Sequence, residues 1–264
     1  MKLKRNPFWK RVLIDIITIN VLLLPAVLLR FLATPFKRGF YCDDEAIRYP
    51  FKNNTVTAVC LILLATVGPL TTFLVVEKLR IMLNQTKRDE KPIFWFEVYK
   101  YSVYYLIGLA ISTSITFVCK FSTGRLRPHF IAICDPNITC VVDKYEYIFD
   151  YECRNQNLSA VDEARQSFMS GHSSIICFAV IFLILYLHLR INWKSVENIK
   201  IVIQTLLLLI SICVAVSRIN DNWHHWDDVV IGCLQGSILA FITVFFISDL
   251  KGEEEEEETL SRSP

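Results

Sequence analysis

Three short segments of the chain carry residue types that could do phosphate chemistry. The first, residues 120–129, places Lys120, Arg125 and Arg127 around Gly124 within eight residues. Several cations beside a flexible glycine suit a phosphate or carboxylate group, because lysine and arginine neutralise and hydrogen-bond such groups. A positive collar that contacts lipid headgroups would explain this segment equally well, so alone it does not establish a catalytic site.

The second segment, residues 167–174, reads Ser-Phe-Met-Ser-Gly-His-Ser-Ser and leads into an apolar run. Ser170 is a good N-cap for a helix, and Gly171 would let the backbone amides at the helix start approach an anion. His172 in that position could donate a proton to a leaving oxygen. The alternative interpretation is an ordinary helix cap with an incidental histidine.

The third segment, residues 217–228, contains Arg218, His224 and Asp228. If this stretch is helical, His224 and Asp228 share one face, and the carboxylate can orient the imidazole. An oriented neutral histidine is a nucleophile or a base. A metal site is the competing interpretation, and its ligands would be His224, His225, Asp227 and Asp228. We favour the nucleophile and expect no metal or other cofactor, because adjacent histidines on one short turn diverge.

Hydropathy shows where these segments must lie. Of the 264 residues, 53% are hydrophobic and 20% are charged, and the mean hydropathy is +0.39. Six apolar stretches are each close to the roughly 20 residues that cross a bilayer as a helix: residues 12–32, 55–76, 101–119, 173–189, 201–217 and 229–248. We therefore predict an all-α integral membrane protein, a six-transmembrane-helix bundle that forms a single domain over residues 1–250. The acidic stretch after it, residues 251–264, is predicted to be a disordered cytosolic tail.

The first apolar stretch could also be a cleavable signal peptide, since Lys2, Lys4 and Arg5 precede it. It is long for such a peptide and no Ala-x-Ala cleavage site follows it, so we expect an uncleaved anchor. Asp15 and Arg30 lie near its ends, where long or polar side chains can reach the membrane interface.

The distribution of lysine and arginine predicts the orientation in the membrane. The N-terminal arm and the second and fourth loops are rich in these residues, whereas the short fifth loop carries only Arg218. Positively charged loops stay in the cytosol, so both termini are expected there. The three segments then meet at the extracytosolic interface, where we predict the active site. The expected localisation is the plasma membrane, with this site facing the extracellular or lumenal side.

The outer loops carry features of an oxidising compartment. Four cysteines lie outside the apolar stretches, and Cys140 with Cys153 is the disulfide we expect, although four cysteines allow three pairings. The other five lie in the spans, where free thiols act as small apolar side chains. Asn137, in Asn-Ile-Thr and far from any span, is the best candidate for glycosylation.

The net charge is only +2, and no basic stripe interleaves with aromatic residues, so a nucleic-acid partner is excluded. Together the three segments supply several cations, an amide cradle and two histidines. That set describes phosphoryl transfer through a covalent histidine, in which cations take the place of magnesium in holding the phosphoryl oxygens.

These residues resemble the three motifs of the type 2 phosphatidic acid phosphatase superfamily. The motifs K-x6-RP, PSGH and SR-x5-H-x3-D are matched by Lys120 with Arg127-Pro128, by Ser170-Gly171-His172, and by Ser217-Arg218 with His224 and Asp228. Met169 departs from the proline of the wider superfamily, which affects the rigidity of the turn more than the chemistry. The resemblance extends to the animal lipid phosphate phosphatases across nearly the whole chain, notably over residues 38–51 and 125–130.

The resemblance implies a division of labour at one site. His224 would attack phosphorus and form a phosphohistidine, Asp228 would orient it, and His172 would protonate the departing alcohol. The phosphate-binding residues would be Lys120, Arg127, Ser170, Gly171 and Arg218. The implied activity is metal-independent hydrolysis of phosphatidate, lysophosphatidate, sphingosine 1-phosphate and ceramide 1-phosphate. No role follows for Arg125, His129, His225 or Asp227.

Two other functions stay open on the sequence. A different enzyme of the same superfamily could act on sugar or polyprenyl phosphates or transfer a headgroup, and a non-catalytic lipid-binding scaffold could use the same residues without turnover. The expected partners are the lipid bilayer and phospholipid and sphingolipid phosphate substrates. A homo-oligomer is also open, but we assign no Gly-x-x-x-Gly interface.

Overall fold

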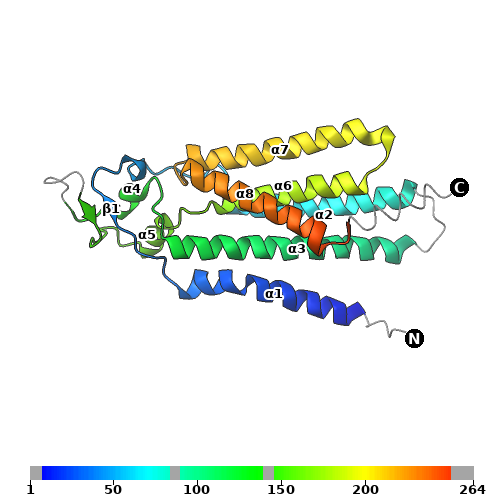
Figure 1. The fold of residues 1–264 in the computed structure, drawn as a ribbon, viewed down its shortest axis with the longest axis horizontal. Helices are drawn as coiled ribbons and strands as arrows, with labels where there is room; N and C mark the ends of the chain where they lie inside the picture. The colour runs from blue at the N-terminus through cyan, green and yellow to red at the C-terminus, as the bar shows by residue number, and fades with distance from the viewer. Residues whose placement is uncertain (1–7, 84–89, 139–145, 251–264) are drawn as a thin grey trace.

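The computed structural model describes residues 8–83, 90–138 and 146–250. Six of its helices are long and apolar enough to cross a membrane, and they lie side by side in one bundle (Figure 1). They are α1 (Phe8–Leu32), α2 (Ala58–Leu83), α3 (Glu90–Thr123), α6 (Gly171–Arg190), α7 (Glu197–Asn220) and α8 (Trp226–Ile242), which the short helix η3 (Thr243–Ile247) continues. The predicted six-helix membrane bundle is confirmed. The predicted acidic tail, 251–264, lies outside the described residues.

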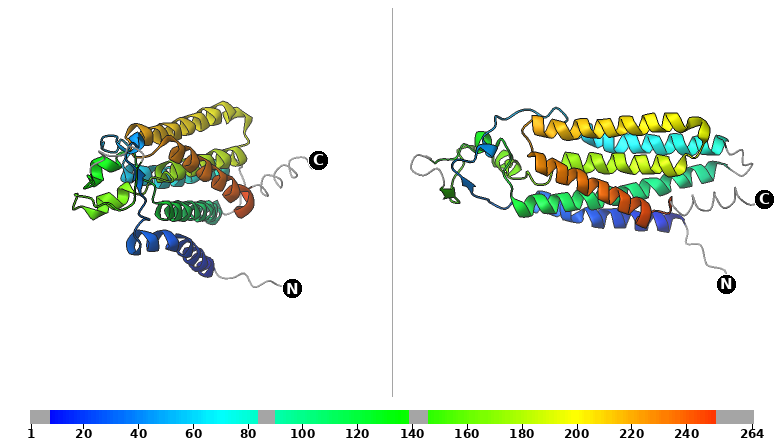
Figure 2. Two further views of the ribbon diagram at one scale, coloured as in Figure 1. Left: turned by 60° about the vertical axis from the view of Figure 1, so that its left-hand side comes forward. Right: turned by 45° about the horizontal axis from the view of Figure 1, so that its top comes forward.

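α6 occupies the centre of the bundle and contacts α2, α3, α7 and α8, whereas α1 lies at the edge and packs on α3 (Figure 2). Aromatic rings from three helices form the core around α6, among them Phe73, Tyr105, Phe182 and Tyr186. Large apolar side chains of α1, α2 and α7 point outward. An apolar exterior of this extent suits lipid as the surrounding solvent.

α2 and α3 continue beyond their apolar stretches because the charges there find partners. Glu77, only 2% exposed, accepts hydrogen bonds from Nε and Nη2 of Arg190 at 3.0 and 2.9 Å and from the Tyr186 hydroxyl at 2.7 Å. Lys100 Nζ lies 2.9 Å from a carboxylate oxygen of Glu97. Since a buried charge is tolerated only when it is paired, this network lets three helices extend and close one end of the bundle.

α8 crosses α6 at close range through two glycines. A Cβ built on Gly236 would lie 2.1 Å from the Ser174 carbonyl oxygen, and one built on Gly232 would lie 2.6 Å from that of Ser170. This Gly-x-x-x-Gly spacing went unrecognised in the sequence. It serves contact between two helices of the same chain and brings the first turns of α6 and α8 together.

The other end of the bundle carries a small cap of loops and short elements. β1 (Phe40–Tyr41) pairs antiparallel with β2 (Tyr147–Ile148), and η1 (Glu45–Ile47), α4 (Phe130–Cys134) and α5 (Leu158–Ala164) surround them. Buried side chains of the first and third loops share one core, which includes Phe40, Ile47, Leu126, Phe130 and Tyr151. The remaining short helix, η2 (Lys194–Val196), joins α6 to α7 at the opposite end.

The predicted disulfide between Cys140 and Cys153 is wrong, because Cys153 is bonded to Cys134. Cys134 ends α4, and a β-bridge between Pro136 and Cys153 brings the two cysteines together. Cys42 is also in a disulfide, and Cys140 lies outside the described residues. The five cysteines of the spans are free, as expected.

Candidate active site

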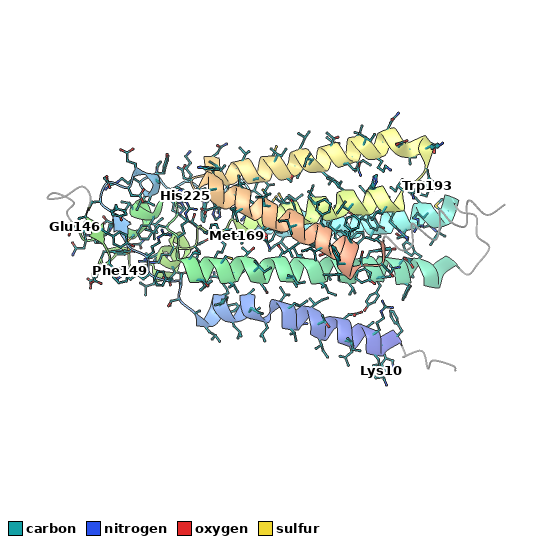
Figure 3. The ribbon with its side chains drawn as sticks, in the orientation of Figure 1. Lys10, Glu146, Phe149, Met169, Trp193 and His225 are labelled. Carbon is teal, nitrogen blue, oxygen red and sulfur yellow. A yellow bond between two sulfur atoms is a disulfide. The ribbon has the colours of Figure 1, made fainter. Side chains whose placement is uncertain are left out.

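All three chemistry-bearing segments meet at the end of the bundle that carries the cap. Met169 and His225 lie at this end, whereas Lys10 and Trp193 lie at the opposite end (Figure 3). A cavity of about 360 Å³ opens there between α1, α2, α3, α5, α6 and the junction of α7 with α8. Six of the eight predicted catalytic and phosphate-binding residues line it: Lys120, Arg127, Gly171, His172, Arg218 and His224. Ser170 and Asp228 are fully buried next to this cavity.

Two buried cations face the cavity from the end of α3 and the segment after it. Lys120 donates a hydrogen bond to the Gln166 carbonyl oxygen at 2.7 Å. The Arg127 guanidinium lies over the ring of Trp223, 4.5 Å from its centroid, and its Nη1 is 3.5 Å from a Glu163 carboxylate oxygen. Nε and Nη1 of Arg127 are buried and donate to no partner within the described residues. Donors in this state are prepared for an oxyanion.

Charge and burial act on Arg127 in opposite directions. Burial lowers the pKa of Arg127 to about 10, and the Glu163 carboxylate partly offsets that effect. Glu163 is the only acidic side chain among the described residues that line the cavity, and it is 56% exposed. Arg127 therefore stays charged at neutral pH. Glu163, its one ionic neighbour among the described residues that line the cavity, is exposed enough to be displaced by a bound oxyanion.

The third cation, Arg218, lies in the last turn of α7 and is 1% exposed. Its Nη1 donates to the Asn54 side-chain oxygen at 2.6 Å and its Nη2 to Asp221 at 2.9 Å. Asp221 in turn accepts from the backbone amide and hydroxyl of Thr55. The first loop thus fixes Arg218 at the cavity wall, a contact that the sequence analysis did not predict.

The start of α6 has the predicted cap geometry. Ser170 is the N-cap, with extended backbone, and its hydroxyl oxygen accepts from the Ser173 amide and hydroxyl. The N-terminal amides of α6 therefore border the cavity at Gly171, where the helix dipole favours an anion. His172 follows in the same turn, and its Nε2 is buried without a hydrogen-bond partner in the described part of the chain.

His224 is held by a backbone group. Its Nδ1 lies 2.7 Å from the Ser167 carbonyl oxygen, whereas the nearer carboxylate oxygen of Asp228 is 4.0 Å away. The stretch is not helical at His224, since α8 begins at Trp226, so the i, i+4 geometry considered for the pair does not apply. A hydrogen bond at Nδ1 assigns the proton to that nitrogen and leaves Nε2 as the basic atom.

Asp228 is fully buried and is held from three sides. One carboxylate oxygen accepts from the Ser167 hydroxyl at 2.6 Å and the His225 amide at 3.1 Å, and the other accepts from Arg125 Nη1 at 2.6 Å. Ser167 therefore links the two residues: its hydroxyl donates to Asp228, and its carbonyl oxygen contacts His224 Nδ1. Ser167 and Arg125 hold Asp228 in place, and the sequence analysis assigned neither of them a role. Arg125 and Arg127 are two residues apart, a spacing that puts both side chains on one face of an extended segment, so it gave no signal that Arg125 contacts Asp228 while Arg127 lines the cavity.

Burial lowers the pKa of His224 well below its usual range, and the neighbouring cations Lys120 and Arg127 lower it further. The imidazole is therefore neutral at physiological pH. A neutral ring with a free Nε2 beside buried cations is the form that attacks an electrophilic phosphorus.

The four residues of the competing metal site do not converge. His225 Nε2 lies 3.0 Å from the Leu126 carbonyl oxygen, and Asp227 pairs with Arg125 at 2.7 Å, so each of these side chains has a partner other than a shared metal position. The described residues contain no group of three or more His, Cys, Asp or Glu side chains arranged to hold a metal ion. Asn137, the glycosylation candidate, is exposed in the cap, and its side-chain oxygen accepts from Arg154.

The chain is similar to known phospholipid phosphatases. Residues 101–251 match the PAP2 superfamily. Over 97% of its length the chain is 37% identical to phospholipid phosphatase 2 of Bos taurus, 91% of which is covered. It is 38% identical to phospholipid phosphatase 2 of Homo sapiens over 91% of this chain and 84% of that protein. No solved structure matches the chain.

Proposed function

This chain belongs to the PAP2 superfamily, and we propose that it hydrolyses lipid phosphate monoesters to the free lipid and inorganic phosphate through a phosphohistidine. It is a lipid phosphate phosphatase, an integral membrane enzyme. The proposed substrates are phosphatidate, lysophosphatidate, sphingosine 1-phosphate and ceramide 1-phosphate. One observation carries the mechanism: His172 in the first turn of α6 and His224 between α7 and α8 line a single cavity together with three buried cations.

The cations bind the phosphoryl group. Lys120, Arg127 and Arg218, with the first amides of α6, surround the position of the phosphoryl oxygens, and Ser170 shapes that helix start. Charge developing on these oxygens in the transition state is stabilised by donors that are already fixed in a buried setting. The orphaned donors of Arg127 support this role, since an oxyanion would satisfy them.

The histidines move the phosphoryl group and the proton. Nε2 of His224 attacks phosphorus, the ester bond to the lipid oxygen breaks, and that oxygen takes a proton from protonated His172. Neutral His172 then accepts a proton from water, whose oxygen attacks the phosphohistidine and breaks the phosphorus–nitrogen bond. Inorganic phosphate leaves, and both histidines regain their starting states.

The phosphohistidine carries a positive ring, and its surroundings suit that charge. Nδ1–H of His224 donates to the Ser167 carbonyl oxygen, and the Asp228 carboxylate lies 4.0 Å from the same nitrogen. The carboxylate carries a full negative charge and the carbonyl oxygen a partial one, so both stabilise the cationic ring more than the neutral ring. In this way Asp228 supports the intermediate.

The walls of the cavity favour a lipid substrate. Besides the cations, its lining includes apolar side chains of three spanning helices: Ala58, Leu61, Ile62, Phe117 and Ile175. A phosphate could reach the cations while its acyl chains stay against this apolar surface. With both termini in the cytosol, as the lysine and arginine distribution predicts, the cavity faces the extracytosolic side, and we propose the plasma membrane as its location.

The test is release of phosphate from micellar phosphatidate by the purified protein, in the presence of EDTA, with His224→Ala measured alongside. We expect turnover by the wild-type protein and none by the variant. His188→Ala, at an exposed position in the last turn of α6, is the matched histidine control and should retain full activity.

Two outcomes would contradict the proposal. Good turnover of glucose phosphate or polyprenyl phosphates without turnover of phosphatidate would assign the site to another substrate class. Equal cellular activity of wild-type and His224→Ala proteins would point to a non-catalytic scaffold.

A further inference from the structure

A cluster of uncharged polar side chains lies inside the spanning part of the bundle, next to the active site. It consists of Ser112 and Thr116 of α3, Ser174 in the first turn of α6, and Gln235 of α8, and we call it the polar cluster. The three hydroxyl residues are buried and Gln235 is half-buried. None of the four lines the active-site cavity, and phosphoryl transfer as described above gives them no role.

The hydrogen bonds of the polar cluster join three helices. The Ser174 hydroxyl donates to Oε1 of Gln235 and lies 2.9 Å from the Ser112 hydroxyl. Thr116 donates to the same Ser174 oxygen at 3.3 Å. Nε2 of Gln235 donates to the carbonyl oxygen and the hydroxyl of Ser112 at 3.4 and 3.3 Å. The side chain of Gln235 therefore reaches both α3 and α6 from α8.

These bonds restrict how the helices can sit against one another. Hydrocarbon offers no water to a polar side chain, so an amide inside a spanning bundle must find its partners on neighbouring helices. A single buried amide can fix the register of packed helices, because few arrangements satisfy its hydrogen bonds. The polar cluster therefore sets the rotation and the height of α3, α6 and α8 relative to one another.

Each of the three helices carries a residue of the active site close to its part of the polar cluster. Thr116 and Lys120 are one turn apart on α3, and Asp228 and Gln235 are two turns apart on α8, so each pair shares one helix face. A Cβ built on Gly171 would lie 3.6 Å from Thr116 Cγ2 and 3.7 Å from Lys120 Cε. The start of α6 thus rests on α3 beside both the cluster and a phosphate-binding cation.

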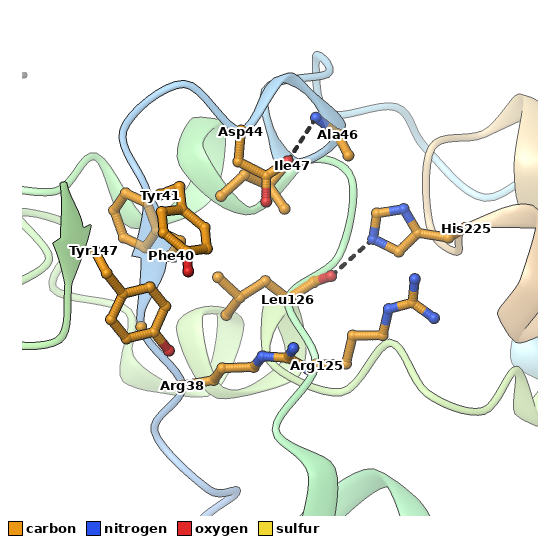
Figure 4. Close-up of a pocket in the computed structure, with 11 residues that line it drawn as sticks. Arg38, Phe40, Tyr41, Asp44, Ala46, Ile47, Arg125, Leu126, Tyr147 and His225 are labelled. Carbon is orange, nitrogen blue, oxygen red and sulfur yellow. Dashed lines mark hydrogen bonds between the residues drawn. The ribbon is translucent and has the colours of Figure 1, made fainter. Parts of the chain in front are cut away.

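The same segments are also joined on the cap side of the active site. Figure 4 shows the ring of His225, the residue before α8, hydrogen-bonded to the Leu126 carbonyl oxygen in the segment after α3, and the distance is 3.0 Å. In the chain, Lys120 lies between the polar cluster and Leu126, and Asp228 lies between His225 and the cluster. The catalytic groups are therefore held by contacts at two levels, of which the polar cluster is the one inside the bundle.

We propose that Gln235 is a positioning residue for phosphoryl transfer. Through Ser174 and Ser112 it fixes the starts of α6 and α8 against α3, so that His172 and His224 line up on opposite sides of one phosphorus. Attack, phosphorus and leaving oxygen must be in line, and a misplacement of about 1 Å costs roughly 100-fold in rate. Gln235 contacts no reacting group and acts only through the placement of the helices. The inference rests on the proposed function.

Gln235→Leu in the purified full-length protein is the test, because leucine has a similar volume and lacks the amide. We expect kcat for phosphatidate to fall about 10- to 100-fold. Inhibition by inorganic phosphate should weaken less than about threefold, since attraction between charges tolerates small displacements. Orthovanadate forms a five-coordinate adduct with an in-line nitrogen, so its affinity should fall by the same factor as kcat. A wild-type kcat, or an equal loss of phosphate and orthovanadate affinity, would overturn the proposal.

Gln204→Leu is the matched control for general loosening of the bundle. Gln204 lies on α7, and its Nε2 donates to the Ile184 carbonyl oxygen of α6 at 3.0 Å, about three turns beyond Ser174. The same substitution there also removes a hydrogen bond between two spanning helices. It should lower the unfolding temperature and leave kcat and orthovanadate affinity at wild-type values. Equal losses of kcat in the two variants would show that any loosening of the bundle slows the enzyme, and would overturn the proposal.

If Gln235→Leu does not fold, Ser174→Ala takes its place, since it removes only the hydroxyl that donates to Gln235. It should lower kcat about fivefold with phosphate inhibition unchanged, and a wild-type kcat would contradict the proposal. Absence of phosphate release by the wild-type protein would contradict the proposed function alone. Orthovanadate affinity, measured as protection against unfolding, then decides the inference: a weaker affinity in Gln235→Leu supports it, and an unchanged affinity overturns it.

Discussion

Nδ1 of His224 lies 2.7 Å from the backbone carbonyl oxygen of Ser167, and this carbonyl is its direct hydrogen-bond acceptor. The Asp228 carboxylate, 4.0 Å from the ring, instead accepts from the Ser167 hydroxyl at 2.6 Å. Ser167 therefore stands between the two residues on which the mechanism depends. The arrangement differs from a triad, in which the carboxylate itself orients the histidine.

Asp228→Asn should lower phosphatidate turnover by about 10- to 100-fold, the loss typical when a supporting group behind a direct contact is changed. A carboxylate in direct contact with the ring would make the loss about 10⁴-fold. The measurement is kcat, calculated per mole of folded enzyme. A loss of about 10- to 100-fold supports indirect contact through Ser167, and a loss near about 10⁴-fold supports direct contact with the ring.

Ser167→Ala is the companion variant, because it removes the hydroxyl and keeps the carbonyl. We expect a smaller loss than for Asp228→Asn and non-additive effects in the double variant, since both residues act through one contact. Additive losses would show that Asp228 supports His224 independently of Ser167.

Glu163→Gln should strengthen binding of the phosphate group. The carboxylate lies 3.5 Å from Arg127 Nη1 and competes with an oxyanion for that cation. Because Glu163 is 56% exposed, its effect is screened, and we expect only a few-fold tighter inhibition by inorganic phosphate and a similar fall in KM. Asp162→Asn on the same short helix is the control, since Asp162 does not line the cavity. Weaker phosphate inhibition in Glu163→Gln would mean that Glu163 positions Arg127 and does not compete for it.

The sequence predicted the spanning helices and the catalytic residue types for different physical reasons. A bilayer requires about 20 apolar residues per span, so the six helices are visible from composition alone. His224 and Lys120 stood out because few side chains can do this chemistry. The partner of His224 did not, because a backbone carbonyl such as that of Ser167 has no side-chain signature. The pairing of Cys134 with Cys153 depends on how α4 packs in the cap, and no local pattern predicts that contact.

Protein stability should fall as the pH is lowered from about 6.5 to about 4. Burial lowers the pKa of His129 from an ordinary 6.5 to about 4, and Arg127 contributes, while the hydrogen bond to the Asn222 carbonyl opposes the shift. Between these values the unfolded chain binds a proton that folded His129 does not, so each pH unit costs up to about 1.4 kcal/mol for this residue. His224, whose pKa is also lowered, adds to the slope.

The measurement is the unfolding temperature in detergent at a series of pH values. His129→Phe keeps a ring between Phe51 and Trp223, and its stability should depend less steeply on pH than that of the wild-type protein. His188→Gln, at an exposed position, should leave the slope unchanged. A wild-type slope in His129→Phe would assign the acid sensitivity to other groups.

Gly236→Ala tests whether the close crossing of α6 and α8 holds the site together. The added Cβ would lie 2.1 Å from the Ser174 carbonyl oxygen and 2.9 Å from the Phe178 amide, both of them backbone atoms, so the helices must move apart. Overpacking of this kind costs about 1–3 kcal/mol, and the displaced turn begins two residues after His172. We expect a lower unfolding temperature together with a reduced kcat.

Gly68→Ala is the matched control, because nothing lies within 4 Å of a Cβ built at that position. Replacing a glycine by alanine in a helix interior stabilises the helix by up to about 1 kcal/mol. If Gly236→Ala is as stable and active as the wild-type protein, α8 does not need a glycine at this position to hold the first turn of α6.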